Sequence, residues 1–250
     1  MKKYFIFVVL SFITLIPAFA QEQFIVKGKI EFEKKVNLHK QLDNIQENDE
    51  WRNMIKNITP PVKTSYFDLY FNSNKSIYMP GREVVTTQRV PEWFDGPAAD
   101  NIVFTDLDQQ RVISQKTVFD NIFNLHDSIR KIDWKMTADT RTIAGIECRK
   151  ATAIIMDTVF VVAFYAEQIV TPVGPESFAG LPGMILGLAV PRLNTTWFAT
   201  KLEITDVKET ILIPPKKGKK TTSSDLKTLL KPSMKDWGKT GAKNMLQVSI

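Results

Sequence analysis

Few side chains in this chain could take part in catalysis, and they lie far apart in the sequence. The chain has two histidines, His39 and His126, and one cysteine, Cys148. A Cys148–His126 pair could act as nucleophile and base, but nothing in the spacing favours that pairing. The sequence contains no HExxH, no Cys-x-x-Cys and no histidine pair at metal-ligand spacing. A metal site is therefore not expected.

Other catalytic patterns are equally weak. Asp106 and Asp108 lie in Phe104-Thr105-Asp106-Leu107-Asp108, a pattern that favours a turn at a strand end over a pair of catalytic carboxylates. The chain has no G-x-S-x-G, and no glycine loop is followed by the lysine and helix that a nucleotide site needs. We therefore expect a protein that is not an enzyme and that carries no cofactor.

The first residues have the three parts of a secretory signal peptide. Lys2-Lys3 precede an apolar run over 4–16, and Ala18-Phe19-Ala20 follows, so cleavage is expected between Ala20 and Gln21. An uncleaved anchor is the alternative, although the run is short for a membrane span. The residue directly after the cleavage point is Gln21 rather than a cysteine, which argues against a lipid-anchored N-terminus, and no later stretch reaches about 18 apolar residues. We expect an exported chain that does not span the membrane and is periplasmic, outer-membrane associated or secreted.

The rest of the chain is predicted to form one domain and a basic tail. After the signal peptide at 1–20, residues 21–214 carry a net charge of −3, whereas 215–250 carry +7. This tail is expected to be partly disordered, with a short helix from Asp225 that Pro232 would stop. The tail can be read as a linker or as a segment that contacts an anionic membrane surface. Nucleic acid is not an expected partner of an exported chain.

The pattern between signal and tail is mostly that of β-strands. Residues 24–36 alternate apolar and polar side chains, as in a half-buried antiparallel strand. Residues 37–57 have the spacing of an amphipathic helix, broken around Asn48-Asp49. Short breaks at Asn72-Ser73-Asn74 and Met156-Asp157-Thr158 predict hairpins. We expect an α+β, mostly β fold, with a curved, half-barrel-like antiparallel sheet, one early helix and short helical turns on its inner face.

A corner rich in glycine and proline covers residues 174–186. Pro175 suits the first position of a helical turn, and Gly180 can close that turn. Leu181-Pro182-Gly183-Met184 then fits a type II turn that leads into a buried strand. The corner can be read as a cap on the core or as a surface for a ligand or partner.

This corner also carries a family resemblance. Gly180-Leu181-Pro182-Gly183-Met184-Ile185, together with Trp134 and the segment Gly145-Ile146-Glu147-Cys148-Arg149-Lys150-Ala151, resembles the GLPGLI family of exported bacterial proteins. The chain departs from that pattern at Met184 and Ile146. The resemblance implies export but no biochemical activity. At the level of fold, the expected sheet is also similar to periplasmic carriers of lipoproteins, in which a half-open barrel encloses an apolar hollow.

The hypothesis drawn from these observations is a non-catalytic binding or carrier module of the cell envelope. It would hold an apolar ligand or a protein partner near the corner. The expected site residues are Phe164, Gly174, Pro175, Phe178, Gly180, Leu181, Pro182, Gly183 and Met184. The alternative is an accessory subunit that docks on an outer-membrane assembly, and a hydrolase is the least supported reading. A cavity beside these residues would favour the carrier, and a closed core with exposed aromatic side chains would favour docking.

Three further features have two readings each. Cys148 can be a structural strand residue or a reactive, disulfide-forming or metal-binding thiol. Trp93-Phe94 can fold inward or meet a partner. Trp134 can anchor the core or serve as a binding platform.

Overall fold

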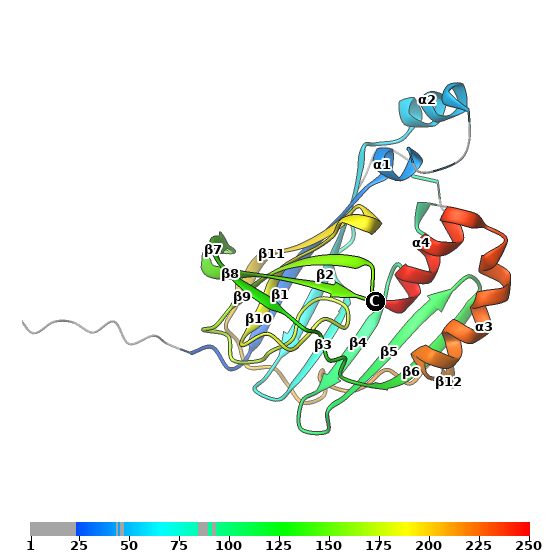
Figure 1. Cartoon of the computed structure of the whole chain (residues 1–250). Coiled ribbons are helices and arrows are strands. Elements are labelled where there is room, and N and C mark those ends of the chain that lie inside the picture. The colour runs from blue at the N-terminus through cyan, green and yellow to red at the C-terminus, as the bar shows by residue number, and fades with distance from the viewer. Residues whose placement is uncertain (1–23, 44, 46–47, 85–89, 92–93) are drawn as a thin grey trace, which may run out of the picture.

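A single curved β-sheet forms the body of the molecule (Figure 1). The computed structural model describes residues 24–43, 45, 48–84, 90–91 and 94–250. Twelve strands follow the order β12-β6-β5-β4-β3-β2-β1-β11-β10-β9-β8-β7. They are β1 (Gly28–Asn37), β2 (Val62–Phe71), β3 (Lys75–Pro80), β4 (Ile102–Asp106), β5 (Arg111–Val118), β6 (Asn121–Ser128), β7 (Lys135–Ile143), β8 (Ile146–Ile155), β9 (Val159–Ala166), β10 (Met184–Val190), β11 (Thr195–Glu203) and β12 (Lys219–Thr221). The mostly β, α+β prediction is confirmed.

Neighbouring strands are antiparallel except β12, which lies parallel to β6. The two predicted hairpins are confirmed, because Phe71 pairs with Ser76 and Ile155 pairs with Val159. The second turn places Met156 and Asp157 at φ angles of 48° and 63°, the left-handed region that a tight hairpin turn needs. Local turn chemistry thus sets the order of these strands.

The early helix predicted over 37–57 is present as two helices. They are α1 (Leu38–Leu42) and α2 (Asp49–Ile58). The Asn48 side chain accepts a hydrogen bond from the Trp51 N–H and caps α2, so the break lies at the predicted position. Figure 1 shows both helices beyond the end of the β1–β2 pair.

The segment after residue 214 differs from the expected disordered tail. It forms β12 and two helices, α3 (Ser223–Lys235) and α4 (Gly238–Ser249). Pro232 lies inside α3 and does not end it. The reason is packing: Leu226, Leu230 and Met234 recur every fourth residue and are buried against β6. The apolar stripe offsets the hydrogen bond that the proline removes.

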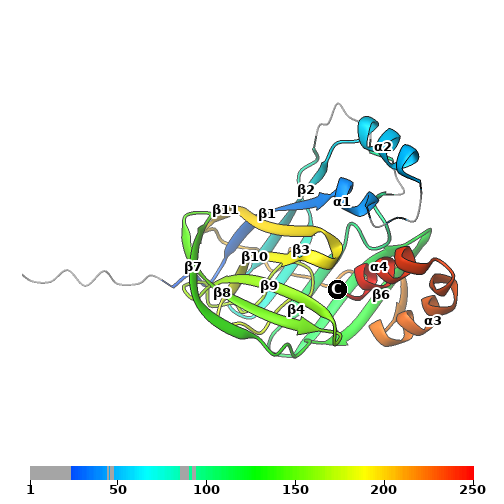
Figure 2. The same cartoon turned by 45° about the horizontal axis from the view of Figure 1, so that its top comes forward.

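The main core lies inside the curve of the sheet. Its largest side chains come from both halves of the sheet and include Trp197, Tyr78 and Tyr165. Figure 2 shows α4 entering the hollow with its C-terminal end, where Ile250 joins the core. Within the described residues, no helix has the length and apolarity that a membrane crossing requires.

Candidate functional site

The tip of the corner is a tight turn between two paired segments. Val173 pairs with Ala179, and the Phe178 N–H donates to the Pro175 carbonyl at 3.4 Å. Glu176 at the tip has a φ of 56°, which a right-handed helix cannot accommodate. The predicted one-turn helix is therefore wrong.

The second half of the corner also differs in detail from the prediction. The Gly183 N–H donates to the Leu181 carbonyl at 2.8 Å, and the Met184 N–H donates across to Ile169 at 3.1 Å. This is a three-residue turn rather than the predicted four-residue type II turn. The positive φ of Gly183, 149°, is as expected. A Cβ there would lie 2.2 Å from the Ala166 carbonyl oxygen, so close backbone approach requires glycine.

The nine predicted site residues serve mostly as packing. Phe178, Leu181 and Met184 are buried in the main core, and Gly174 and Pro175 are buried beside them. Gly183 is also buried, whereas Gly180 and Pro182 are exposed. Phe164 is half-buried and points to the opposite face of β9 from Tyr165. The two cavities described below include none of the nine.

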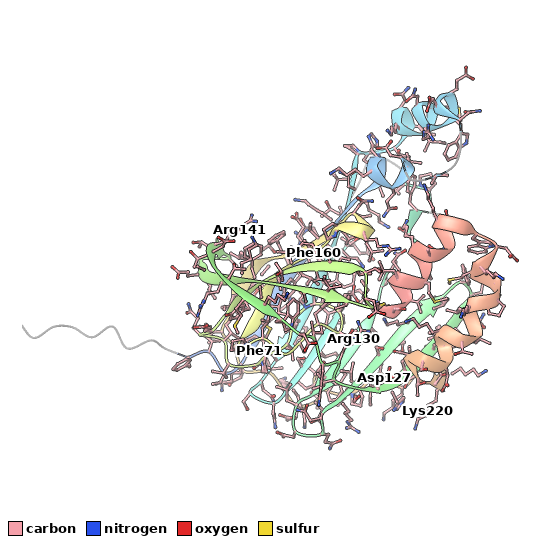
Figure 3. All side chains as sticks on the ribbon, viewed as in Figure 1. Phe71, Asp127, Arg130, Arg141, Phe160 and Lys220 are labelled. Atoms are coloured by element: carbon pink, nitrogen blue, oxygen red, sulfur yellow. The ribbon has the colours of Figure 1, made fainter. Side chains whose placement is uncertain are left out.

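Phe164 packs at the margin of the main core, beside a second aromatic ring. Its ring lies 6.4 Å from that of Phe198, and the Arg141 guanidinium sits 4.7 Å from the Phe198 centroid. Figure 3 labels Arg141 at the end of the molecule that carries β7. Phe164 is thus a half-buried side chain at the margin of the core, whereas Phe178, Leu181 and Met184 are buried within the core.

Two side chains tie the corner to other elements. The Trp134 indole N–H donates to the Ala179 carbonyl at 3.0 Å, so this half-buried ring acts as an anchor. The Ser177 hydroxyl donates to the Ile250 carbonyl at 2.5 Å. The corner is thus joined to the last residue of the described chain.

A buried ion pair lies directly under the corner. The Lys34 ammonium donates to Glu176 Oε1 at 3.3 Å and to the Ala99 carbonyl at 2.9 Å. Asn101 Nδ2 donates to Glu176 Oε2 at 2.8 Å. Lys34 is 9% exposed and Glu176 is 2% exposed, so both charges are removed from water and depend on each other.

This ion pair was not predicted from the sequence, although the position of Lys34 on the inner face of β1 could have been. Lys34 has the same parity along β1 as Ile30 and Phe32, so alternation places it on the inner face. Nothing local marks Glu176 as its partner, because the two lie 142 positions apart. Long-range pairing of this kind is not visible in residue spacing.

Further polar groups surround the pair. The Tyr78 hydroxyl, the Trp197 indole N–H and the Asn101 side-chain carbonyl are buried without a hydrogen-bond partner among the described residues. Burial raises the pKa of Tyr78 well above its usual value, and the Glu176 charge adds to that effect. A cavity of about 40 Å³ adjoins Lys34, Glu176 and Trp197, which is room for a few waters and no larger ligand.

The C-terminal end of α4 closes this region. Lys116 Nζ donates to the Val248 carbonyl at 2.9 Å, and the Arg130 guanidinium donates to the Ser249 carbonyl; Arg130 is labelled in Figure 3. Cations at the last turn suit the negative end of a helix dipole. Burial lowers the pKa of Lys116 to about 8. The end of α4 is therefore fixed inside the sheet by two charges.

A second, larger cavity of about 530 Å³ lies at the other end of α4. It is bordered by α1, by the 3-10 helix η2 (Pro191–Leu193) and by α4. Three cations reach it, namely Arg192, Lys239 and Lys243. No pattern in the sequence had indicated this cavity, because its walls come from three distant segments.

The remaining candidates for chemistry have structural roles. Burial in the core raises the pKa of the Cys148 thiol to about 12, so it is a structural strand residue. The Asp106 carboxylate accepts from the Gln109 N–H at 3.0 Å, as expected of a turn. His126 hydrogen-bonds Asn124 at 2.6 Å. Phe94 is buried and so folds inward, while Trp93 lies outside the described residues.

His39 lies in α1, and its Nε2 is 3.2 Å from the Thr59 carbonyl oxygen. Within the part of the chain that the structure describes, no three His, Cys, Asp or Glu side chains gather as metal ligands would.

One family model matches a stretch of the chain that includes the corner. Residues 154–187 match the model of a family described as "Protein of unknown function (Porph_ging)". The matched stretch covers β9, the corner and the start of β10. The GLPGLI resemblance itself remains a prediction. A search of curated proteins found no significant match.

Two solved structures share the fold. They are described as "Structure of PNGF-II in P21 space group" and "Structure of PNGF-II in C2 space group", and each aligns over 86% of this chain with a TM-score of 0.51. Sequence identity is 15% and 13%, which shows a common fold and nothing about activity. This chain spans only 34% and 33% of those chains.

Proposed function

We propose that this protein is an exported, non-catalytic module of the cell envelope that docks on an anionic membrane surface. The observation that carries the proposal is a basic face on α3 that ends at an exposed aromatic pair. Export rests on the signal peptide predicted over 1–20, and the destination is the periplasm or the outer membrane.

The lysines of this face form one stripe. Lys227, Lys231 and Lys235 are exposed and recur every fourth residue of α3, which aligns them along one side of the helix. Lys220, labelled in Figure 3, lies in β12, close to the start of α3. Each lysine near an anionic bilayer contributes on the order of 1 kcal/mol.

The aromatic pair lies next to the end of α3. The rings of Phe119 and Trp237 meet edge to face with centroids 5.5 Å apart, and the two residues are 45% and 46% exposed. Aromatic side chains favour the interface between lipid headgroups and water. Lysines and aromatic rings together match the composition of surfaces that lie on membranes.

A carrier with its ligand at the corner is less well supported. Its expected cavity would lie beside Phe178, Leu181 and Met184, and these side chains are packed in the core. Docking on a protein of an outer-membrane assembly is the second candidate. It is favoured by exposed apolar residues on β7, β8 and β9, namely Met136, Ile154 and Phe160.

Co-sedimentation with vesicles tests the proposal. The protein should bind vesicles of phosphatidylglycerol and phosphatidylcholine, and not phosphatidylcholine alone. The triple variant K227Q/K231Q/K235Q should lose most of that binding. A matched variant, K135Q/K201Q/K208Q, removes three exposed lysines elsewhere and should bind as the native protein does. Equal vesicle binding by both variants would refute the role of the basic face. If the protein were retained only by detergent-solubilised outer-membrane protein, the second candidate would be favoured.

A further inference from the structure

We infer that the cavity between α1, η2 and α4 binds a small amphiphilic anion, a molecule with an apolar body and one phosphate, sulfate or carboxylate group. Its volume of about 530 Å³ lies within the range of sites that hold small molecules. This inference is independent of docking on a membrane. It places a ligand at a different location from the corner that the sequence suggested.

The charge of the cavity wall selects an anion. Arg192, Lys239 and Lys243 contribute three cations, and the described residues of the wall include no aspartate or glutamate. Arginine and lysine side chains bind phosphate and carboxylate groups through charge-assisted hydrogen bonds. A neutral ligand would gain no charge-assisted hydrogen bond from these side chains, and a cationic ligand would be repelled by them.

The N-terminal end of α4 adds to the same potential. Trp237 precedes the helix, and its side chain makes no capping hydrogen bond to the backbone N–H groups of the first turn, which have no partner within the helix. Lys239 and Thr240 of that turn line the cavity. The positive end of the helix dipole therefore acts together with the cationic side chains.

Lys243 is the most specific group of the site. It is half-buried, and its Nζ donates to Gln41 Oε1 at 2.8 Å. Gln41 is held in turn because its Nε2 donates to the Leu193 carbonyl at 3.3 Å. Burial lowers the pKa of Lys243 to about 8, which leaves the ammonium mostly protonated at neutral pH. Its bonded partner is a neutral amide, so an anion would supply the missing countercharge.

The apolar part of the wall accounts for the body of the ligand. Ile45, Phe94, Pro191 and Ala242 line the cavity. Phe94 is itself packed on Leu38 and Leu42 of α1, so its ring is held in place in this wall. A free inorganic anion would leave most of the apolar surface and volume unfilled.

Calorimetric titration with three probes tests the inference on the full-length mature protein. Octyl phosphate, used below its critical micelle concentration, should bind at least about ten-fold more tightly than octanol or inorganic phosphate. K243Q and R192Q should each weaken octyl phosphate binding about ten-fold. A242F keeps every charge but fills the cavity, so it should abolish octyl phosphate binding. K135Q/K201Q should bind as the native protein does.

Each contrary outcome overturns a stated part of the inference. Equal affinity for octanol would show that the site does not require an anionic group. Equal affinity for inorganic phosphate would show that it does not require an apolar body. Undiminished binding to A242F would place the ligand elsewhere. Melting temperatures measured for every variant separate lost binding from lost folding, and vesicle binding by A242F separates this site from the basic face of α3.

Discussion

The buried Lys34–Glu176 pair allows a sharp test of how the corner is held. Glu176→Gln keeps the shape of the side chain and removes its charge. Lys34 would then remain 9% exposed with a neutral neighbour in place of a carboxylate. Removing one member of a buried pair destabilises proteins by about 3–5 kcal/mol.

The remaining contacts of Lys34 place the expected loss of stability at the lower end of this range. Lys34 keeps its bond to the Ala99 carbonyl at 2.9 Å and remains 5.1 Å and 5.5 Å from the Phe67 and Trp197 ring centroids. These contacts stabilise the ammonium in part. The left-handed backbone of Glu176 is the same in both proteins, so its strain cancels. We therefore expect a loss of about 3 kcal/mol, at the lower end of that range.

Urea unfolding followed by tryptophan fluorescence and circular dichroism measures the change. E176Q should lose about 3 kcal/mol, and K34M/E176Q should recover most of it because no buried charge is left unpaired. The exposed Lys201–Glu203 pair, at 2.9 Å, supplies the control, and E203Q should leave the free energy of unfolding almost unchanged because solvent screens an exposed pair. A loss below about 1 kcal/mol for E176Q, or a double variant as unstable as the sum of its singles, would refute the reasoning.

Three further predictions follow from particular contacts. Gly183→Val should lower the free energy of unfolding by about 3 kcal/mol or more and reduce the soluble yield, because the new Cβ would lie 2.2 Å from the Ala166 carbonyl oxygen. The control Gly145→Ala has open space around the new Cβ and should lower it by only about 1–2 kcal/mol. Burial lowers the pKa of Lys116 to about 8, so above that pH the unfolded chain binds more protons than the folded chain. The free energy of unfolding should therefore rise by up to about 3 kcal/mol between pH 8 and 10.5. The variant K116M should show a smaller rise. Cys148, buried with a pKa raised to about 12, should react with Ellman's reagent only after unfolding, and a fast reaction in native buffer would contradict its assignment to the core.

Elements governed by neighbouring residues could be predicted from the sequence. The alternation along β1, the break at Asn48 and the turn at Met156-Asp157 depend on contacts within a few positions. Periodicity, capping and turn chemistry all operate at that range. Strands joined by such short turns lie side by side, as in the β2–β3 and β8–β9 pairs.

The conformation of the corner could not be predicted because distant groups determine it. Glu176 adopts a φ of 56°, which is unfavourable for a residue with a side chain. Its carboxylate is held there by Lys34 from β1 and Asn101 from the start of β4. Glycine and proline marked where the chain bends, but the buried ion pair determines how it bends.

The two C-terminal helices were not predicted in full, because the lysine content of residues 215–250 was given more weight than the spacing of the apolar residues. The lysines of 215–250 suggested a solvated tail, yet Leu226, Leu230 and Met234 have the period of a packed helix. Both readings describe real surfaces of α3. The lysines form its exposed side and the apolar stripe forms its buried side, so net charge indicated the outer surface and periodicity indicated the fold.

The two ends of α4 have different roles in the proposals made for this protein. Its C-terminal end is held in the sheet by Lys116 and Arg130, so it cannot leave without exposing buried charges. Its N-terminal end follows Trp237, an exposed residue of the docking face, and carries Lys239, which lines the cavity. Only Gly238 therefore lies between the surface proposed to meet lipid and the site proposed to bind an amphiphile. An amphiphilic anion held at a membrane surface beside Trp237 would therefore meet the protein close to the N-terminal end of α4, whose residues line the cavity.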